Sequence, residues 1–304
     1  MKEILRITIG LTLSCLIAAA VMGLAFVVTA KAKKQNEQMY MHETMLGLLG
    51  YSDARPAPSD LRFYRVYRYI IVDGDTKLVG YMVPLERGEE KGYGLVVIDL
   101  KGRFVEALDL SISPEEAVEA PKREKALKAL LKPPKAFAYG DTTIIARRAE
   151  RRLAYLLPGA FPGFKTFISI MLALDPNFKV LGLEIVEHEE DPGLGAEIDQ
   201  AYFKHQFKGK SLERIKAIEV VREPLPEQYK RYLERPTWGK GAFTETQIEE
   251  IRKAYEDKDI YAITGATISS RSVSDGVRNM TKRFAYRMEK LDQVLVGQGI
   301  KVLF

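Results

Sequence analysis

Residues 260–270, Ile260-Tyr261-Ala262-Ile263-Thr264-Gly265-Ala266-Thr267-Ile268-Ser269-Ser270, decide how the C-terminal part of the chain folds. The stretch begins as an apolar, strand-like run, turns at Gly265-Ala266 and continues into a cluster of hydroxyl side chains. A helical pattern follows, because apolar residues recur at steps of three and four: Val273, Val277, Met280, Phe284, Met288 and Leu291. The sequence therefore predicts a strand, a tight turn and a helix, with Ser270 or Ser272 as the N-cap.

This predicted turn has the features of a phosphate-binding site. Amides at a helix N-terminus point at a bound anion, the helix dipole favours negative charge, and Gly265 would let the backbone approach closely. The alternative is an ordinary helix cap rich in serine and threonine. A second motif is therefore needed to decide between them.

The residues Thr264-Gly265-Ala266-Thr267 resemble the [S/T]-G-A-T element of the FMN-binding domain family. In that family the last threonine is joined to FMN by a phosphoester bond, so the resemblance implies that Thr267 is the covalent attachment site. It also implies that Thr264, Gly265, Ala266 and Ser269 lie around the cofactor.

One position departs from the family pattern. The pattern usually has an aspartate six residues before the modified threonine, and here that position is Tyr261. Asp259 lies two residues earlier. The departure concerns how the flavin transferase that modifies the threonine would recognise this chain.

A second motif, Glu187-His188-Glu189-Glu190-Asp191-Pro192-Gly193-Leu194-Gly195, is similar to the H-x-E-T-P-G-L-G loop of the same family. Glu190-Asp191 stands where Glu-Thr is common, and residues 163–186 resemble the strand pair that precedes the loop, with Asp175-Pro176-Asn177 as the turn. Two motifs in the right order make an accidental match far less probable. We expect this loop to lie beside the Thr267 turn, with Gly193, Leu194 and Gly195 against the flavin and Glu189 hydrogen-bonded nearby.

The chain resembles the G subunit of the Rnf electron-transport complex and, second, the C subunit of the sodium-translocating NADH:quinone oxidoreductase. The resemblance implies a membrane-anchored flavoprotein that carries electrons through covalent FMN in an ion-translocating oxidoreductase complex. Its partners would be the other membrane and peripheral subunits, and a flavin transferase for maturation. The alternatives are a subunit of a related quinone-reductase complex, or a non-redox envelope scaffold with unmodified Thr267.

Composition argues against several other functions for this chain of 304 residues and net charge +5. No basic run is interleaved with aromatic residues, so nucleic acid is not an expected partner. The histidines His42, His188 and His205 have no ligand spacing with cysteine, so no metal site is expected. Neither G-x-S-x-G nor G-x-G-x-x-G occurs, and we assign no catalytic residue.

Residues 7–30 contain no charged side chain and are long enough to cross a bilayer as one helix. We expect residues 1–34 to be a single-pass anchor in the cell inner (plasma) membrane, with a cleaved signal peptide as the rival interpretation. Basic residues flank the run on both sides: Lys2 and Arg6 before it, and Lys31, Lys33 and Lys34 after it. This distribution weakly favours a cytoplasmic body. The family resemblance implies that the flavin domain is extracytoplasmic, and we follow the family.

The expected fold class is α+β, with the membrane helix followed by an FMN-binding domain of mixed or antiparallel strands and packed helices. Residues 35–60 are typical of a stalk and linker, 61–158 of an N-terminal α+β portion, and 159–304 form the expected FMN-binding domain. Predicted strands are 63–72, 77–83, 93–99 and 103–110, predicted helices are 122–131, 146–157 and 244–255, and Pro236-Thr237-Trp238-Gly239 is a predicted loop. Residues 95–108 faintly repeat the pattern of residues 169–183, so a duplicated unit without its own flavin motif stays open as an interpretation.

Overall fold

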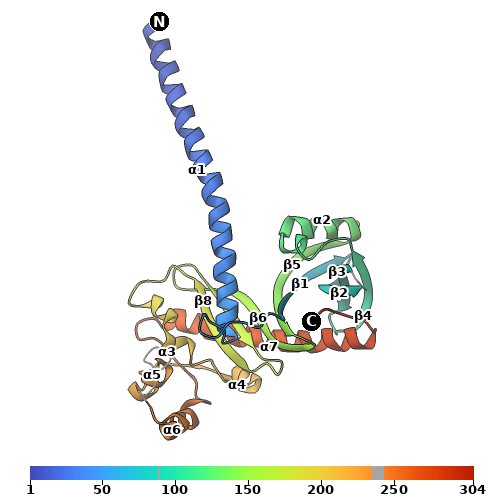
Figure 1. Cartoon of the computed structure of the whole chain (residues 1–304), viewed down its shortest axis with the longest axis vertical. Helices are drawn as coiled ribbons and strands as arrows, with labels where there is room; N and C mark the ends of the chain where they lie inside the picture. The colour runs from blue at the N-terminus through green and yellow to red at the C-terminus, as the bar shows by residue number, and fades with distance from the viewer. Residues whose placement is uncertain (88–89, 235–242) are drawn as a thin grey trace. The chain divides into compact units, whose positions relative to one another are not determined.

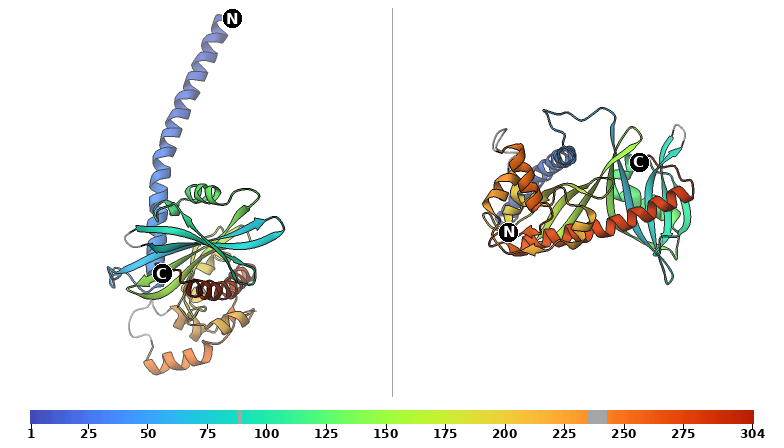
Figure 2. Two further views of the ribbon diagram at one scale, coloured as in Figure 1. Left: turned by 90° about the vertical axis from the view of Figure 1, so that its right-hand side faces the viewer. Right: turned by 90° about the horizontal axis from the view of Figure 1, so that it is seen from below.

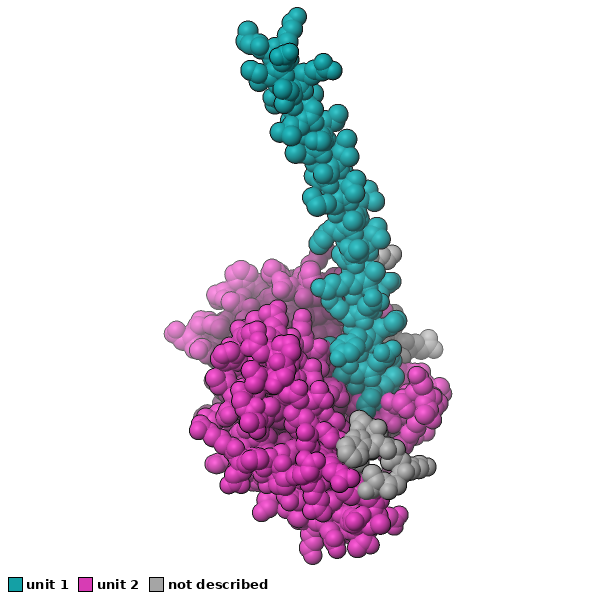
Figure 3. All heavy atoms as spheres, turned by 90° about the vertical axis from the view of Figure 1, so that its left-hand side faces the viewer, with its two compact units in different colours: residues 1–47 teal, residues 48–304 magenta. Residues whose placement is uncertain are grey.

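The computed structural model describes residues 1–87, 90–234 and 243–304, and the chain divides into two compact units, residues 1–47 and 48–304 (Figure 3). The first unit is almost entirely one helix, α1 (Lys2–Leu48), which is long and apolar enough to cross a membrane. The helix continues from the apolar run into the predicted stalk and linker and ends at Leu48. The predicted loop at residues 236–239 lies outside the described residues.

Eight antiparallel strands in the second unit form one sheet with the order β4-β3-β2-β1-β5-β6-β7-β8 (Figure 1). Their bounds are β1 Leu61–Asp73, β2 Thr76–Arg87, β3 Glu90–Asp99, β4 Phe104–Leu110, β5 Ala136–Arg148, β6 Arg151–Pro162, β7 Phe167–Leu174 and β8 Val180–Glu187. Each half of the sheet is a four-stranded meander, and the halves meet where β1 pairs with β5. The expected boundary at residues 158–159 falls inside β6, so one sheet spans both expected portions. The α+β class is confirmed.

The prediction of a helix over residues 146–157 is wrong. These residues form the end of β5, a tight turn and most of β6, with Arg148 opposite Arg151 and Ala149 at a φ of 49°. Alanine, arginine and leucine are strong helix formers, which is why the local sequence favours a helix. Both strands have partners on their other side, β1 and β7, and this pairing within the sheet overrides the local preference.

The two halves of the sheet repeat the same construction. Strands β1 and β5 each have 13 residues, and β2 and β6 each have 12. The first hairpin of each half turns through a residue with positive φ, Gly74 at 58° and Ala149 at 49°. After its four strands each half continues into a short 3-10 helix and then an α-helix, η1 (Glu116–Val118) and α2 (Ala120–Leu130) in the first half, η2 (Gly195–Asp199) and α3 (Ala201–Lys204) in the second.

The hairpins β3–β4 and β7–β8 share an aspartate turn with the same hydrogen bonds. Asp99 Oδ1 accepts from the amides of Lys101 and Arg103 at 2.8 and 2.9 Å. Asp175 Oδ1 accepts from the amides of residues 177 and 179 at the same two distances. In each turn the fourth residue has positive φ, 80° at Gly102 and 62° at Phe178. This agreement supports the interpretation that the halves arose by duplication.

Helices cover both faces of the sheet (Figure 1). Helix α7 (Thr267–Gly297), with 31 residues, packs on one face through Val273, Val277 and Phe284, among apolar side chains from both halves. The right view of Figure 2 shows this helix extending across the strands of both halves. Helix α2 covers the opposite face of the first half with the fully buried Leu127.

The remaining elements connect β8 to α7. They are α4 (Leu212–Ala217), β9 (Val220–Val221), α5 (Glu227–Glu234), α6 (Glu245–Tyr255) and β10 (Ile260–Tyr261). Helix α6 begins with a capping box of Thr244 and Gln247, which confirms the predicted helix over residues 244–255. Strands β9 and β10 pair in parallel.

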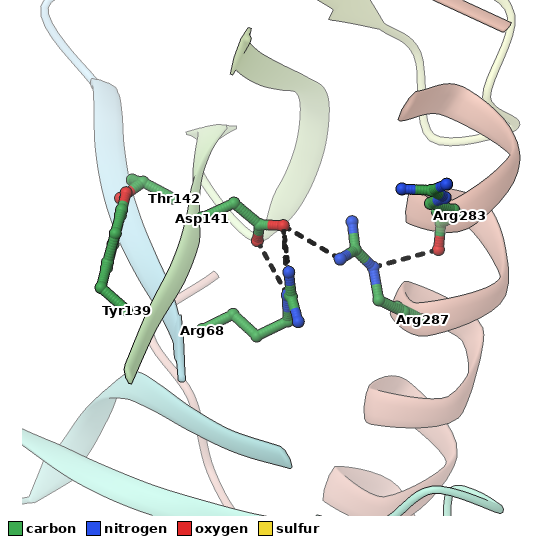
Figure 4. A network of polar contacts seen from close by, with 6 residues as sticks. All are labelled: Arg68, Tyr139, Asp141, Thr142, Arg283 and Arg287. Carbon is green, nitrogen blue, oxygen red and sulfur yellow. Dashed lines mark hydrogen bonds and ion pairs between the residues drawn. The ribbon is translucent and has the colours of Figure 1, made fainter. Parts of the chain in front are cut away.

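A polar network fastens the C-terminal part of α7 to the sheet (Figure 4). Asp141 of β5 accepts hydrogen bonds from Arg68 of β1 at 2.6 Å and from Arg287 of α7 at 2.9 Å. Burial opposes ionisation of Asp141, but the two guanidinium groups outweigh it and lower the pKa of this carboxyl. The carboxylate is therefore charged at neutral pH and joins two strands to the helix.

Candidate functional site

The turn before α7 is fixed by a small set of local hydrogen bonds. The amide of Ala266 donates to the carbonyl of Ile263 at 3.0 Å, and Gly265 has a φ of 80°. A bond between the first and fourth residues with positive φ at the third is the geometry of a type II turn, which favours glycine there. Ser270 is fully buried, and its Oγ accepts from the amide of Ile263 at 3.0 Å. The turn is therefore fastened to the helix that follows it.

The helix begins earlier than the sequence predicts. Its first residue is Thr267 and its N-cap is Ala266, so the expectation of Ser270 or Ser272 as the N-cap is wrong. Both serines lie inside the helix, where Ser272 Oγ donates to the carbonyl of Pro162 at 2.7 Å. Ala266 supplies no capping side chain. The N–H groups in the first turn of this 31-residue helix can therefore donate hydrogen bonds to another acceptor. Half-buried Thr267 stands at this end of the helix.

A cavity of about 300 Å³ opens at this helix N-terminus. Three segments that are distant in sequence line it: Phe164 from the β6–β7 connection; Glu190, Asp191, Leu194 and Gly195 from the loop after β8; and Gly265, Ala266, Thr267, Ile268 and Ser269 from the turn and first helical residues. Its volume is at the lower end of the range for pockets that hold organic ligands. Apolar side chains and backbone dominate the lining, so the cavity suits a flat ring system that carries an anionic group.

Glu190 ties the three segments together. Its carboxylate is buried, with 5% of the residue exposed. One oxygen accepts from the amides of Phe164 and Lys165 at 2.8 and 3.2 Å, and the other accepts from the hydroxyl of Ser269. A buried carboxylate is stable only when such donors replace water. The three bonds therefore hold the β6–β7 connection, the loop and the first turn of α7 in one arrangement.

Glycines let these segments approach one another closely. A Cβ atom on Gly195 would lie 2.5 Å from the Glu190 carboxylate and 3.1 Å from Ser269 Oγ. A Cβ atom on Gly265 would lie 3.0 Å from a methyl group of Leu194. The Pro-Gly-Leu-Gly loop therefore packs directly against the Thr267 turn.

Outside the cavity, further polar contacts support the loop. His188 Nδ1 accepts from the amide of Glu190 at 3.1 Å, and its Nε2 lies 2.9 Å from Asp199. Since Nδ1 is an acceptor, Nε2 carries the proton and donates to the carboxylate. Lys165 pairs with Asp191 at the mouth, and this hydrogen bond raises the pKa of the Lys165 ammonium. The loop is thus held from both sides.

The structure brings most of the sequence-predicted site residues to one place. Thr267, Gly265, Ala266, Ser269, Leu194 and Gly195 all line the cavity. Thr264, Gly193 and Glu189 do not line it, and all three are exposed.

The sequence reasoning chose Glu189 where the buried carboxylate is Glu190. The alignment of Glu190-Asp191 with the family's Glu-Thr carried the signal that could have identified it. Phe164 and Ile268 line the cavity without any sequence signal for their role.

Residues 163–282 match the FMN-binding domain family. This part of the chain is therefore similar to that family, in agreement with the resemblance carried by the two motifs. The matched range contains every residue that lines the cavity.

A particular relative is the G subunit of the proton-translocating ferredoxin:NAD(+) oxidoreductase complex of Clostridium ljungdahlii, which is 28% identical over 138 residues. The match covers 45% of this chain and 57% of the relative, so it spans little more than half of that protein's length. Two solved structures are also similar. NqrC of Shewanella oneidensis has 18% identity and a TM-score of 0.33 over 50% of this chain and 59% of its own. The C subunit of the Na(+)-translocating NADH-quinone reductase of Parabacteroides distasonis has 17% identity and a TM-score of 0.34 over 64% of this chain and 74% of its own.

Proposed function

We propose that this chain is a membrane-anchored electron-transfer subunit of an Rnf-type oxidoreductase complex, with FMN joined covalently to Thr267. The observation that carries the proposal is the position of Thr267 at the uncapped start of α7, in the wall of a cavity that the Pro-Gly-Leu-Gly loop completes. The FMN-binding domain match over residues 163–282 supports the identity of the cofactor.

The residues around the cavity fit FMN. The first amides of α7 would hold the phosphate. Their hydrogen bonds and the helix dipole would stabilise the bound phosphate by about 1 kcal/mol. Leu194, Phe164 and Ile268 present apolar surface on which the ring system would lie. When bound, the flavin supplies the capacity to accept and donate electrons, and the chain supplies its position and surroundings.

Attachment requires an activated phosphate, because a hydroxyl does not displace water from FMN itself. We infer that the donor is a flavin dinucleotide such as FAD, used by a flavin transferase. The Thr267 hydroxyl oxygen would attack the flavin-side phosphorus, the pyrophosphate bond would break, AMP would leave, and the hydroxyl proton would pass to the transferase or to water. No oxidation or reduction occurs in this step.

Helix α1 would anchor the chain as a single span in the plasma membrane, with the flavin domain on the extracytoplasmic side. The length and apolar composition of α1 support the span, and the name of the Clostridium relative supports a multisubunit partner complex. The other membrane and peripheral subunits would supply and remove electrons. The sequence-matched part of that relative is too short to carry over the whole reaction.

Mass spectrometry of the tryptic peptide of residues 259–271 tests the attachment, using full-length protein made in a host that contains the transferase. We expect FMN on Thr267 of the wild-type chain and none on the Thr267→Ala variant, which should fold because the side chain is half-buried at a helix end. Thr264→Ala is the matched control, since Thr264 is exposed outside the cavity lining, and it should keep its flavin. An unmodified wild-type peptide, or flavin on another residue, contradicts the proposal.

A non-redox scaffold built on the same fold is the alternative. In that case a denaturing gel would show no flavin fluorescence on the protein band under ultraviolet light, even after production with the transferase. A covalent flavin stays fluorescent on the band and excludes the scaffold.

A further inference from the structure

Strand β10, which leads into the Thr267 turn, has strand β9 on one side and the side chain of Gln206 on the other. On the first side the amide of Ile260 donates to the carbonyl of Glu219 at 3.0 Å in the parallel pairing with β9. On the second side Gln206 Oε1 accepts from the amide of Tyr261 at 2.7 Å, and Gln206 Nε2 donates to the carbonyl of the same residue at 3.2 Å. The side-chain amide of Gln206 therefore takes the place of a neighbouring strand.

The segment just before β10 is held by a second buried side chain from the same region. Lys210 is 1% exposed, and its Nζ donates to the carbonyls of Glu256 and Lys258 at 2.7 and 2.6 Å. Gln206 is 2% exposed. Burying an amide and an ammonium is costly unless each is hydrogen-bonded, so both side chains stabilise this one course of the backbone and penalise alternatives.

The next acidic residue along the segment is also engaged. Asp259 accepts from Arg214 Nη2 at 2.5 Å and from the amide of Glu219 at 3.0 Å. Tyr261, at the position where the family pattern has an aspartate, packs its ring against Tyr229 with the centroids 6.4 Å apart. The segment that leads to Thr267 therefore has a fixed backbone, and its Asp259 is paired with Arg214.

Resting on the proposed function, we propose that Gln206 and Lys210 are positioning residues for flavin attachment. They hold residues 256–261 so that the Thr267 turn has the shape on which the transferase acts. Attachment at Thr267 then requires the folded body of the protein and not the local sequence alone. Preorganisation of this kind reduces the conformational entropy lost when the transferase binds the turn.

The test compares rates of flavin attachment in a purified reaction with FAD and a flavin transferase. The substrates are the full-length chain in detergent, a synthetic peptide of residues 256–275, and the full-length variants Gln206→Met and Gln200→Met. Gln200 is exposed, so its variant makes the same chemical change without touching the turn. In-gel fluorescence and mass spectrometry measure incorporation, and circular dichroism verifies that each variant is folded.

We expect the peptide and Gln206→Met to react slower than the wild-type chain by about tenfold or more, because misplacement of a reacting group lowers its rate steeply. Gln200→Met should react at the wild-type rate. Hydrogen exchange of the flavin-free chain should show faster exchange at the amides of residues 262–266 in Gln206→Met than in Gln200→Met, which a loss of global stability alone would not confine to this turn.

A peptide that reacts as fast as the folded chain overturns the inference, and so does a folded Gln206→Met variant with the wild-type rate. Where Gln206→Met does not fold, a peptide that reacts as fast as the folded chain still overturns the inference. A wild-type chain that takes no flavin at Thr267 removes the proposed function as well. Equal labelling of the chain and the peptide removes only the role of Gln206 and Lys210.

Discussion

At the scale of single residues, two neighbouring glutamates have opposite situations. Glu189 is exposed, whereas Glu190 is buried and accepts three hydrogen bonds from two other segments. No periodicity distinguishes them, because both lie in a loop. Periodicity could therefore not say which of the two carboxylates enters this site. The alignment of Glu190 with the glutamate of the family's Glu-Thr pair was the signal that could have distinguished them.

We expect Glu190→Ala to lower the free energy of unfolding by about 2–3 kcal/mol, because it leaves buried donors without an acceptor. Glu189→Ala should change the same free energy by less than about 0.5 kcal/mol, as exposed substitutions usually do. Urea unfolding of the two full-length variants, followed by circular dichroism, makes the comparison. Similar values for both variants would mean that Glu190 does not hold the three segments together.

At the scale of elements, the β1–β2 and β3–β4 hairpins were predictable from the sequence and the β5–β6 hairpin was not. Turns such as Asp73-Gly74 and Lys101-Gly102 mark strand ends in the sequence, and the predicted strands 63–72, 77–83, 93–99 and 103–110 are confirmed. The β5–β6 turn at Ala149 carries no such mark, and its flanks are rich in helix formers. The predicted start of α7 was wrong because the Ser270 hydroxyl accepts from the amide of Ile263, which precedes the helix, instead of capping the helix.

The attachment of α7 to the sheet depends on Asp141. Replacing it with asparagine leaves Arg68 and Arg287 without their carboxylate, and we expect a loss of about 1–2 kcal/mol at pH 7, between the values for exposed and buried pairs. Because the pKa of Asp141 is lower in the folded chain than in the unfolded chain, its contribution is complete above about pH 4 and is lost as pH falls through the folded pKa.

Urea unfolding of the wild-type chain and of Asp141→Asn over a range of acid pH measures this contribution. The difference between the two chains should shrink as the solution becomes more acidic. Asp60→Asn is the control, since Asp60 pairs with Arg148 where both side chains are half exposed, and it should have little effect at any pH. A difference that stays constant with pH would contradict the role assigned to the Asp141 charge.

At the scale of the whole molecule, the chain divides into an apolar helix and a body with its own core. We expect a chain lacking residues 1–30 to fold and stay in solution without detergent, because these residues include the entire uncharged run. Size-exclusion chromatography and circular dichroism of the truncated chain test this expectation. Recovery of the truncated chain only as aggregates, while the full chain folds in detergent, would show that the body depends on the anchor.

Helix α7 bears on how electrons would reach and leave the site. Its 31 residues extend for about 45 Å, with Thr267 at one tip and Arg287 bonded to Asp141 of β5, where the two halves of the sheet meet, and its apolar side chains pack among those of both halves. A rod bound to both halves removes any hinge between them. A flavin on Thr267 would therefore not move on a flexible arm, and carrying it from one partner to another would require the body of residues 48–304 to move as one rigid unit.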